Sequence, residues 1–232
     1  MQARAGRIGL DPARIGRFIT PMTRPILYSF RRCPYAMRAR LSIVASGLQV
    51  ELREILLRDK APAFLAASPK GTVPVVVNGD TVIEESLDVM EWALGQSDPQ
   101  GLLYAGPEAR ELVLRCESEF KGHLDRFKYA VRYDDVDREE ERKLASVYLR
   151  ELDRRLDGQE YLFGERIGFA DIGIAPFVRQ FANTDRAWFD GQDWPNLIRW
   201  LDGFINSDRF QSIMNKYPKW EEGDAETLFP VS

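Results

Sequence analysis

Every strand signal in this chain lies before residue 96, and this asymmetry limits the folds open to it. Short apolar or β-branched runs occupy 25–31, 50–57 and 73–83, and helix-like segments separate and follow them. In the third run, Asn78-Gly79-Asp80 stands between two β-branched stretches, which is the strongest short-range signal for a hairpin. The first 95 residues therefore predict a βαβ unit followed by αββα, a mixed three-layer α/β domain.

The remainder of the chain predicts helices alone. Residues 170–182 are apolar nearly all round, which is typical of a central helix, and 194–204 carry a further apolar face. Two longer stripes repeat at helical spacing: Leu112, Cys116, Phe120, Leu124 and Phe127, then Leu144, Tyr148, Leu152 and Leu156. We expect an α/β plus all-α protein with a leader 1–24, an α/β domain 25–95, a linker 96–107, an all-helical domain 108–217 and a tail 218–232.

The composition excludes several classes of protein. The formal net charge is −4, which argues against a nucleic-acid binder, and no apolar run is long enough for a membrane span. The single histidine, His123, excludes a multi-histidine metal site, and we expect no metal. Two cysteines are too few for a disulfide framework, so the sequence favours a reducing cytoplasm.

The leader carries five arginines against one acidic residue. Organelle-targeting peptides are rich in arginine and poor in acids, so such a peptide is one interpretation. A flexible extension and a translation start at Met22 are the others, and the sequence leaves the choice among the three open.

Cys33 stands where a strand is expected to end and a helix to begin. Pro34 suits the first helical turn, where its missing N–H costs nothing, and Gly47 is expected to cap the far end. The positive end of a helix favours thiolate over thiol, and Arg31 and Arg32 add positive charge nearby. The sequence therefore predicts a lowered pKa for the Cys33 thiol.

Cys33 has no second cysteine beside it that could resolve a disulfide. Where a Cys-x-x-Cys motif carries its second thiol, this chain has Ala36. Cys116 falls on an apolar helix stripe and is expected to be structural. A lone thiolate that attacks disulfides must be regenerated by an external thiol, which indicates glutathione chemistry with a mixed disulfide as intermediate.

Two further motifs suit a peptide ligand that carries a carboxylate. Val73-Pro74 precedes a strand, and a cis bond there would turn the Val73 amide toward an extended ligand. Glu85-Ser86 begins a helix, where serine is a preferred N-cap and free N–H groups bind anions. Taken alone, each motif also fits an ordinary strand start or helix cap.

Taken in order, these motifs resemble one family. They are Leu27-Tyr28-Ser29, Cys33-Pro34-Tyr35-Ala36-Met37-Arg38-Ala39-Arg40-Leu41, Lys60, Val73-Pro74 and Glu85-Ser86. Their order and spacing are similar to those of cytosolic glutathione transferases, and Cys-Pro-[Phe/Tyr]-Ala resembles the omega-like, cysteine-type classes. The resemblance implies a thioredoxin-like N-terminal domain over 25–95 and a helical-bundle C-terminal domain over 105–217.

The resemblance also implies a role for each residue of the site. Cys33 would form the mixed disulfide with glutathione, and Lys60 would bind the glycyl carboxylate. Val73, ahead of a cis Pro74, would pair with the cysteinyl backbone of glutathione, and Glu85-Ser86 would hold the γ-glutamyl end. It further implies a homodimer, a detoxification role, and thiol transfer that reduces mixed disulfides or dehydroascorbate-like oxidants.

A pocket for a second substrate is expected between the domains, opposite Cys33. Aromatic and basic residues near the end of the first long helix are candidates for its wall. The candidate lining residues are Tyr35, Phe127, Tyr129, Arg132 and Tyr133, although an aromatic cluster at helical spacing also fits a core.

Two positions in the helical domain have a structural interpretation. Gly168-Phe169-Ala170-Asp171 occupies the place of the family's helical capping box, with glycine where the family has Ser or Thr. Asp171 is still expected to accept a hydrogen bond from the backbone N–H at the cap. His123 lies about one helical turn from Phe120 and Phe127, and we expect it to be structural rather than a catalytic base.

Two other functions stay open on the sequence. A conjugating transferase would activate the thiol of glutathione through the hydroxyl of Ser29 or Tyr28, although a cysteine at position 33 would trap the peptide as a disulfide. A non-catalytic binding module of the same fold would need neither the thiol nor the ligand contacts, and this chain carries both.

Overall fold

The strands form one five-stranded sheet in the order β4-β3-β1-β2-β5. The computed structural model describes residues 24–231, so the expected leader lies outside the described residues except for Arg24. β1 (Ile26–Ser29) pairs in parallel with β2 (Val50–Glu54) and antiparallel with β3 (Val75–Asn78). β3 and β4 (Thr81–Ile83) form the predicted hairpin, in which Gly79 adopts a φ of +59° that suits glycine.

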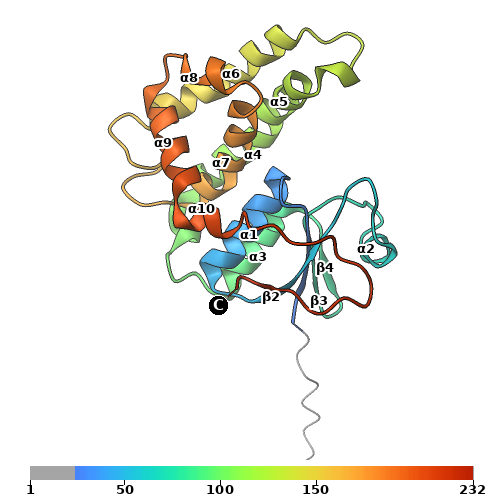
Figure 1. Ribbon diagram of the computed structural model, residues 1–232. Helices are drawn as coiled ribbons and strands as arrows, with labels where there is room; N and C mark the ends of the chain where they lie inside the picture. Colours follow the sequence, from blue (N-terminus) through green and yellow to red (C-terminus); the bar gives the residue numbers. More distant parts are fainter. Residues whose placement is uncertain (1–23, 232) are drawn as a thin grey trace, which may run out of the picture.

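Helices cover both faces of the sheet (Figure 1). α1 (Pro34–Ser46) and α3 (Ser86–Gln96) cover one face, and α2 (Pro62–Ala67) lies on the other. The alternation of β1 explains the two layers, because Leu27 packs among the α1 and α3 side chains while Tyr28 packs against Phe64 of α2. The expected thioredoxin-like domain is confirmed.

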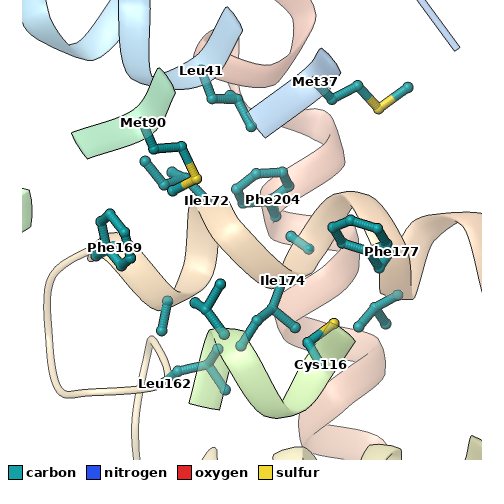
Figure 2. Packing of buried hydrophobic residues seen from close by; sticks show 14 of the residues in the cluster. Met37, Leu41, Met90, Cys116, Leu162, Phe169, Ile172, Ile174, Phe177 and Phe204 are labelled. Carbon is teal, nitrogen blue, oxygen red and sulfur yellow. The ribbon is translucent and has the colours of Figure 1, made fainter. Parts of the chain in front are cut away.

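The second half of the chain is helical, as expected. Its elements are η2 (Leu102–Ala105), α4 (Gly106–Arg115), the π-helical turn η3 (Cys116–Phe120), α5 (Lys121–Lys128), η4 (Ala130–Arg132), α6 (Arg138–Arg155), α7 (Phe169–Ala182), α8 (Arg186–Asp190), α9 (Pro195–Asn206) and α10 (Asp208–Ser212). α7 is the central helix, and Figure 2 shows its Ile172, Ile174 and Phe177 among side chains of the surrounding elements. α1 packs on both α3 and α7, so it joins the two halves.

The structure changes the expected helices in two places. The stripe from Leu112 to Phe127 is interrupted by the π turn η3, and the segment expected as a linker already contains η2 and the start of α4. Leu144 was expected in the core, but it is exposed, and Leu149 is buried instead. At 100° per residue, Leu144 lies roughly 100° from the centre of the buried face of α6, which explains the difference.

The tail is tied to the first half of the chain. β5 (Leu228–Phe229) pairs antiparallel with β2, and the Trp220 N–H donates to the backbone carbonyl of Glu54 at 2.9 Å. The Trp220 ring lies 4.2 Å from the Arg53 guanidinium, measured to the ring centroid. In Figure 1 the red C-terminal segment accordingly runs from α10 back to the sheet. The sequence analysis assigned no element to this segment.

Asp171 is the buried polar centre of the helical half. Its carboxylate accepts hydrogen bonds from the Gly168 N–H at 2.8 Å, the Leu162 N–H at 3.0 Å and the Trp200 indole N–H at 2.8 Å. The bond to Gly168 confirms the predicted back-bond of the capping box. The other two donors come from the preceding loop and from α9, so a single side chain joins three segments.

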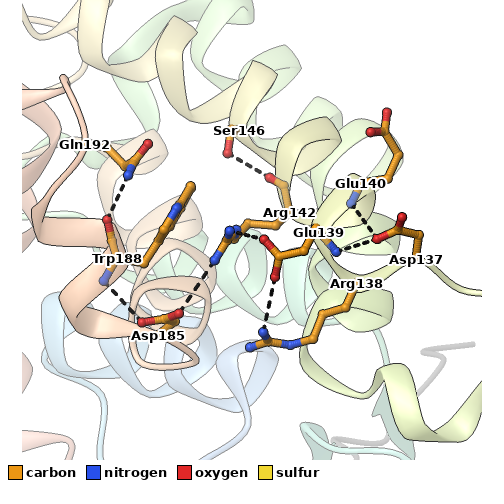
Figure 3. Close-up of polar contacts among 9 residues, drawn as sticks. All are labelled: Asp137, Arg138, Glu139, Glu140, Arg142, Ser146, Asp185, Trp188 and Gln192. Atoms are coloured by element: carbon orange, nitrogen blue, oxygen red, sulfur yellow. Dashed lines mark hydrogen bonds and ion pairs between the residues drawn. The ribbon is translucent and has the colours of Figure 1, made fainter.

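A second polar cluster joins the start of α6 to α8 (Figure 3). Asp137 caps α6 by accepting from the Glu139 and Glu140 N–H groups, and Asp185 caps α8 by accepting from the Trp188 N–H. The Arg142 guanidinium lies 3.6 Å from an Asp185 oxygen and 4.1 Å from the centroid of the Trp188 ring. These contacts orient α6 and α8 away from the sheet.

We expect Asp171→Asn to lower the free energy of unfolding by about 2–4 kcal/mol, because the amide has one acceptor oxygen for three buried donors. Urea denaturation followed by tryptophan fluorescence measures the change. The matched control is Asp190→Asn, which breaks an exposed ion pair with Arg186 and should cost no more than about 1 kcal/mol. Equal effects of the two substitutions would contradict the role of Asp171.

Candidate active site

Cys33 occupies the N-cap position of α1, directly after β1 and a short turn. Its N–H donates to the Phe30 carbonyl at 3.0 Å, and its own carbonyl accepts from the Met37 N–H at 2.9 Å. The thiol donates a weak hydrogen bond to the Val73 carbonyl, with an Sγ to oxygen distance of 3.7 Å. The cysteine and the strand-initiating proline motif are therefore neighbours, although they are far apart in the sequence.

The expected lowering of the Cys33 pKa is wrong. Burial of the thiol raises its pKa and outweighs the backbone N–H groups of Ala36 and Tyr35, which favour the thiolate. The nearby positive charges that oppose the rise come from Lys121 and Arg38. The thiol is therefore held in its protonated form to higher pH than an ordinary cysteine.

Arg31 and Arg32 do not act on the thiol in the way the sequence suggested. The backbone N–H of Arg31 donates to the Glu54 carboxylate at 2.6 Å, and its guanidinium reaches toward the Met214 carbonyl at 3.5 Å. The Arg32 guanidinium lies over the Phe30 ring, 5.3 Å from its centroid. The charges of both side chains are thus directed toward other partners.

The first cavity beside Cys33 has a volume of about 460 Å³. It brings together all the residues that the sequence analysis assigned to a thiol-peptide site, and the Val73–Pro74 bond is cis, as the resemblance implied. Its lining residues are Cys33, Tyr35, Leu57, Lys60, Lys70, Gly71, Thr72, Val73, Pro74, Glu84, Glu85, Ser86 and Glu117. The loop after α2, the start of α3 and the turn η3 all contribute to this cavity.

The start of α3 differs in detail from the expected cap. Glu85, not Ser86, is the N-cap residue, and its side chain makes no capping hydrogen bond to the backbone of α3. The Ser86 hydroxyl instead accepts from the guanidinium of buried Arg38 at 3.3 Å. The Glu85 carboxylate forms an exposed ion pair with Lys70. The Ser86 side chain is therefore held by the buried arginine, and the N-terminal end of α3 lines the cavity.

Lys60 lies beside a glycine that the loop requires. Gly71 adopts a φ of +62°, and a Cβ built on it would lie 3.1 Å from the Lys60 Nζ and 3.2 Å from a methyl carbon of Leu65. A side chain at position 71 would therefore be strained and would displace the lysine. Gly71, Thr72 and Lys70 were missed by the sequence analysis, because an isolated Lys-Gly-Thr carries no motif.

A second cavity, of about 520 Å³, adjoins Cys33 on its other side. Tyr35 and Tyr129 line it, as predicted, but the other expected residues do not form its wall. The lining residues are Phe30, Arg32, Cys33, Pro34, Tyr35, Leu57, Lys121, Asp125, Lys128, Tyr129 and Gln180. The pocket is thus more basic than the expected aromatic wall, since three cations face one carboxylate.

The predicted pocket wall is wrong at three residues, Phe127, Arg132 and Tyr133. Phe127 is buried in the helical core, with its ring centroid 5.1 Å from that of Phe181. Arg132 and Tyr133 follow the end of α5 and are exposed, and the Arg132 guanidinium lies 4.2 Å from the centroid of Tyr129. The turn η4 carries the chain out of the helical direction, which removes both residues from the expected wall.

The hydroxyl groups of Ser29 and Tyr28 are unsuited to activating a bound thiol. Ser29 is fully buried and accepts from the Arg40 guanidinium at 2.8 Å. Tyr28 is buried between Phe64 and Trp220, and its hydroxyl accepts from Arg53 at 2.8 Å. Neither residue lines the two cavities beside Cys33. This removes the residues on which the conjugating mechanism depended.

The remaining titratable candidates are structural. Cys116 is fully buried, and loss of solvation raises its pKa to about 12. The His123 Nδ1 lies 2.5 Å from the Glu141 carboxylate, which also binds Arg126. Within residues 24–231, no cluster of three or more His, Cys, Asp or Glu side chains is arranged for a metal ion. No helix in the same part of the chain is long and apolar enough to cross a membrane.

Comparison with known proteins adds two family matches. Residues 27–101 match the model of the glutathione S-transferase N-terminal domain, and residues 137–203 match that of the C-terminal domain. The chain is 30% identical over 186 residues to pyrimidodiazepine synthase of Drosophila melanogaster, covering 76% of this chain and 74% of the relative. It is 24% identical over 199 residues to glutathione transferase omega-1 of Caenorhabditis elegans, covering 81% and 79% of the two proteins.

A solved structure supports the fold independently. It is a glutathione transferase family member from Pseudomonas fluorescens with two glutathione bound, and it superposes with a TM-score of 0.72 at 20% identity. The superposition covers 82% of this chain and 92% of that one. Because the two family models follow each other along the chain, and one relative reaches 30% identity over most of both proteins, this chain belongs to the glutathione transferase superfamily of enzymes.

Proposed function

We propose that this enzyme is a glutathione-dependent thiol transferase in which Cys33 forms a mixed disulfide with glutathione. The observation that carries the proposal is the position of Cys33 between two cavities, both of which it lines. The first cavity would hold glutathione, and the second would admit the disulfide or oxidant that reacts with it. The only other cysteine, Cys116, is buried away from both cavities.

The chemistry is two successive thiol–disulfide exchanges. The Cys33 thiolate attacks the glutathionyl sulfur of a mixed disulfide, forms a Cys33–glutathione disulfide and releases the other thiol, which takes up a proton. The thiolate of a second glutathione then attacks that disulfide, leaving as oxidised glutathione and restoring the Cys33 thiolate. One glutathione is thereby consumed for each glutathionyl mixed disulfide that is reduced, because the substrate supplies the other half of the oxidised glutathione. A dehydroascorbate-like oxidant, which brings no glutathionyl group, would consume two.

The first cavity would bind glutathione by its ends and its backbone. Val73, ahead of the cis Pro74, would pair with the cysteinyl backbone, as in the addition of an extended peptide to a sheet edge. The start of α3 at Glu85-Ser86 would hold the γ-glutamyl end, and Lys60 would bind the glycyl carboxylate. Each group lies on the wall of the same cavity as the thiol.

The alternative functions have weaker support. A conjugating role through Ser29 or Tyr28 lacks an available hydroxyl, because both are buried and bound to arginines. A non-catalytic binding module would not explain a cysteine positioned between two cavities. Pyrimidodiazepine synthase and the omega-1 transferase are named as enzymes, which also favours catalysis.

We also propose that the enzyme is a homodimer that works in a reducing cytoplasm with a role in detoxification. The family implies the dimer, and both cysteines are free thiols, as a reducing compartment would maintain them. Light scattering of the purified protein during gel filtration measures the oligomeric state, and a mass of one chain at micromolar concentration would contradict the dimer.

We expect incubation with oxidised glutathione to add one glutathionyl group to the wild-type protein, and reduced glutathione to remove it. The measurement is intact mass. Cys33→Ala should take up no group, whereas the matched variant Cys116→Ala, which removes the other thiol, should react as the wild type does. An adduct on Cys33→Ala, or none on the wild type, would overturn the proposed mechanism.

The rate at which the free enzyme reacts with iodoacetamide should rise with pH through the neutral range. Burial raises the Cys33 pKa above its ordinary value, so the thiolate is a minor species at pH 7 and increases about tenfold for each pH unit below that pKa. The rate is obtained by quenching aliquots of the reaction at successive times and measuring the alkylated fraction by intact mass. A rate that is constant from about pH 6 to 8 would show a low-pKa thiolate and contradict the expectation.

A further inference from the structure

Arg38 of α1 is a buried cation that the proposed thiol chemistry does not use. Its side chain is fully buried, and its guanidinium lies 4.5 Å from the centroid of Phe177 and 5.5 Å from that of Tyr35. The Nε and Nη2 atoms have no hydrogen-bond partner among residues 24–231. Burial of a guanidinium is costly unless its charge is compensated, so its remaining contacts must matter.

Those contacts join the two halves of the enzyme behind the wall of the first cavity. Arg38 Nη1 donates to the Ser86 hydroxyl at 3.3 Å and forms an ion pair with Oε1 of Glu117. Ser86 and Glu117 both line the first cavity, but Ser86 begins α3 and Glu117 belongs to the helical half. The arginine thus fixes the side chains of a serine and a glutamate on the same cavity wall.

The π turn explains how Glu117 reaches this wall. Buried positions 112, 116, 120 and 124 are spaced by four residues, and each such step overruns a regular α-helix by about 40°. The wider turn at η3, closed by a bond from the Lys121 N–H to the Cys116 carbonyl, takes up part of this drift. π-helical turns of this kind occur frequently at functional sites. Cys116 and Phe120 can then be buried while Glu117 faces the cavity.

Glu117 differs from the other carboxylates of the cavity. The Glu85 side chain is 63% exposed and paired with Lys70, which is also exposed, whereas the Glu117 side chain is 35% exposed and held by a buried cation. Glu84 accepts a hydrogen bond from the Ser68 hydroxyl. Oε2 of Glu117 has no hydrogen-bond donor among the described residues, so this oxygen is available to a ligand in the cavity.

We propose that Glu117 binds the ammonium group of the γ-glutamyl residue of glutathione, so that the helical half selects peptides with a free α-amino group. The proposal rests on the proposed function, because it assumes that glutathione occupies the first cavity. A carboxylate that is partly withdrawn from water and already oriented makes a stronger charge-assisted hydrogen bond than a solvated one. Ser86, bound to the same arginine, lies beside it for the other polar groups of the γ-glutamyl end.

The test compares glutathione with its desamino analogue, in which a glutaryl group replaces the γ-glutamyl residue. Both are titrated by calorimetry into Cys33→Ala and into Cys33→Ala/Glu117→Gln, because the missing thiol prevents a mixed disulfide. We expect Glu117→Gln to weaken glutathione binding by about tenfold, the loss of one charge-assisted hydrogen bond, and to leave the binding of the analogue unchanged. The amide oxygen of the glutamine at position 117 can still accept a hydrogen bond from Arg38. The midpoint of thermal unfolding of the variant checks that it is folded.

Glu119→Gln is the matched control, since Glu119 lies in the same π turn but is exposed and bound to Arg115. It should change the affinity for neither peptide. An equal loss for glutathione and for the analogue in the Glu117→Gln variant would show a merely structural role and overturn the proposal. The proposal would also be overturned if Glu117→Gln kept the preference for glutathione over the analogue while Glu85→Gln lost it.

The outcomes also separate this proposal from the proposed function. An equal preference for glutathione over the desamino analogue in Cys33→Ala and in Cys33→Ala/Glu117→Gln would overturn the role of Glu117. It would leave the thiol chemistry of Cys33 in place. Failure of Cys33→Ala to bind either peptide, together with no glutathionyl adduct on the wild-type enzyme, would overturn both.

Discussion

The packing of α1 between the sheet and α7 is the constraint on which the rest of the structure depends. This helix carries Cys33 at its N-cap and two fully buried arginines within it. Arg40 donates to the Ser29 hydroxyl at 2.8 Å and to the Ile213 carbonyl at 3.1 Å, and it pairs with the Glu54 carboxylate. Arg38 bridges Ser86 and Glu117. Because each arginine contacts both halves of the chain, the thiol is positioned by the whole molecule and not by the thioredoxin-like domain alone.

Two opposing effects act on the Cys33 thiol. The N–H groups at the start of α1 favour the thiolate, as the sequence indicated, but desolvation has the larger effect and raises the pKa. The positive charges that oppose it come from the helical half through Lys121 and from inside α1 through Arg38. Both halves of the chain therefore contribute charges that lower the pKa of the thiol, although desolvation has the largest effect.

The features that could be predicted from the sequence are those set by a few neighbouring residues. Pro34 after Cys33, Gly47 at the end of α1 and the Asn-Gly hairpin each specify local backbone geometry, and each is found where expected. A pocket opposite Cys33 could be predicted, but most of its lining could not, because a one-residue widening at η3 decides which side chains of α4 and α5 face inward. Phe127 and Leu144 were misplaced for the same kind of reason, since a helical stripe gives a direction but not the limits of the buried face. Glu117 carried no signal, as its importance comes from Arg38, which lies 79 positions away in the sequence.

The arrangement of the two cavities has a consequence for the order of events. Cys33 and Tyr35 line both, and the Tyr35 ring packs edge-on against Phe177 of α7, with centroids 4.8 Å apart. Lys121 lies over the same tyrosine ring and lines the second cavity, whereas both lysines and glutamates line the first. Within the first cavity, Glu117 favours an ammonium group and Lys60 a carboxylate, whereas Lys121 and Lys128 favour anions in the second cavity. A peptide that carries both charges would thus be oriented before its sulfur meets the thiol, and a second anionic thiol would approach the mixed disulfide from the opposite cavity.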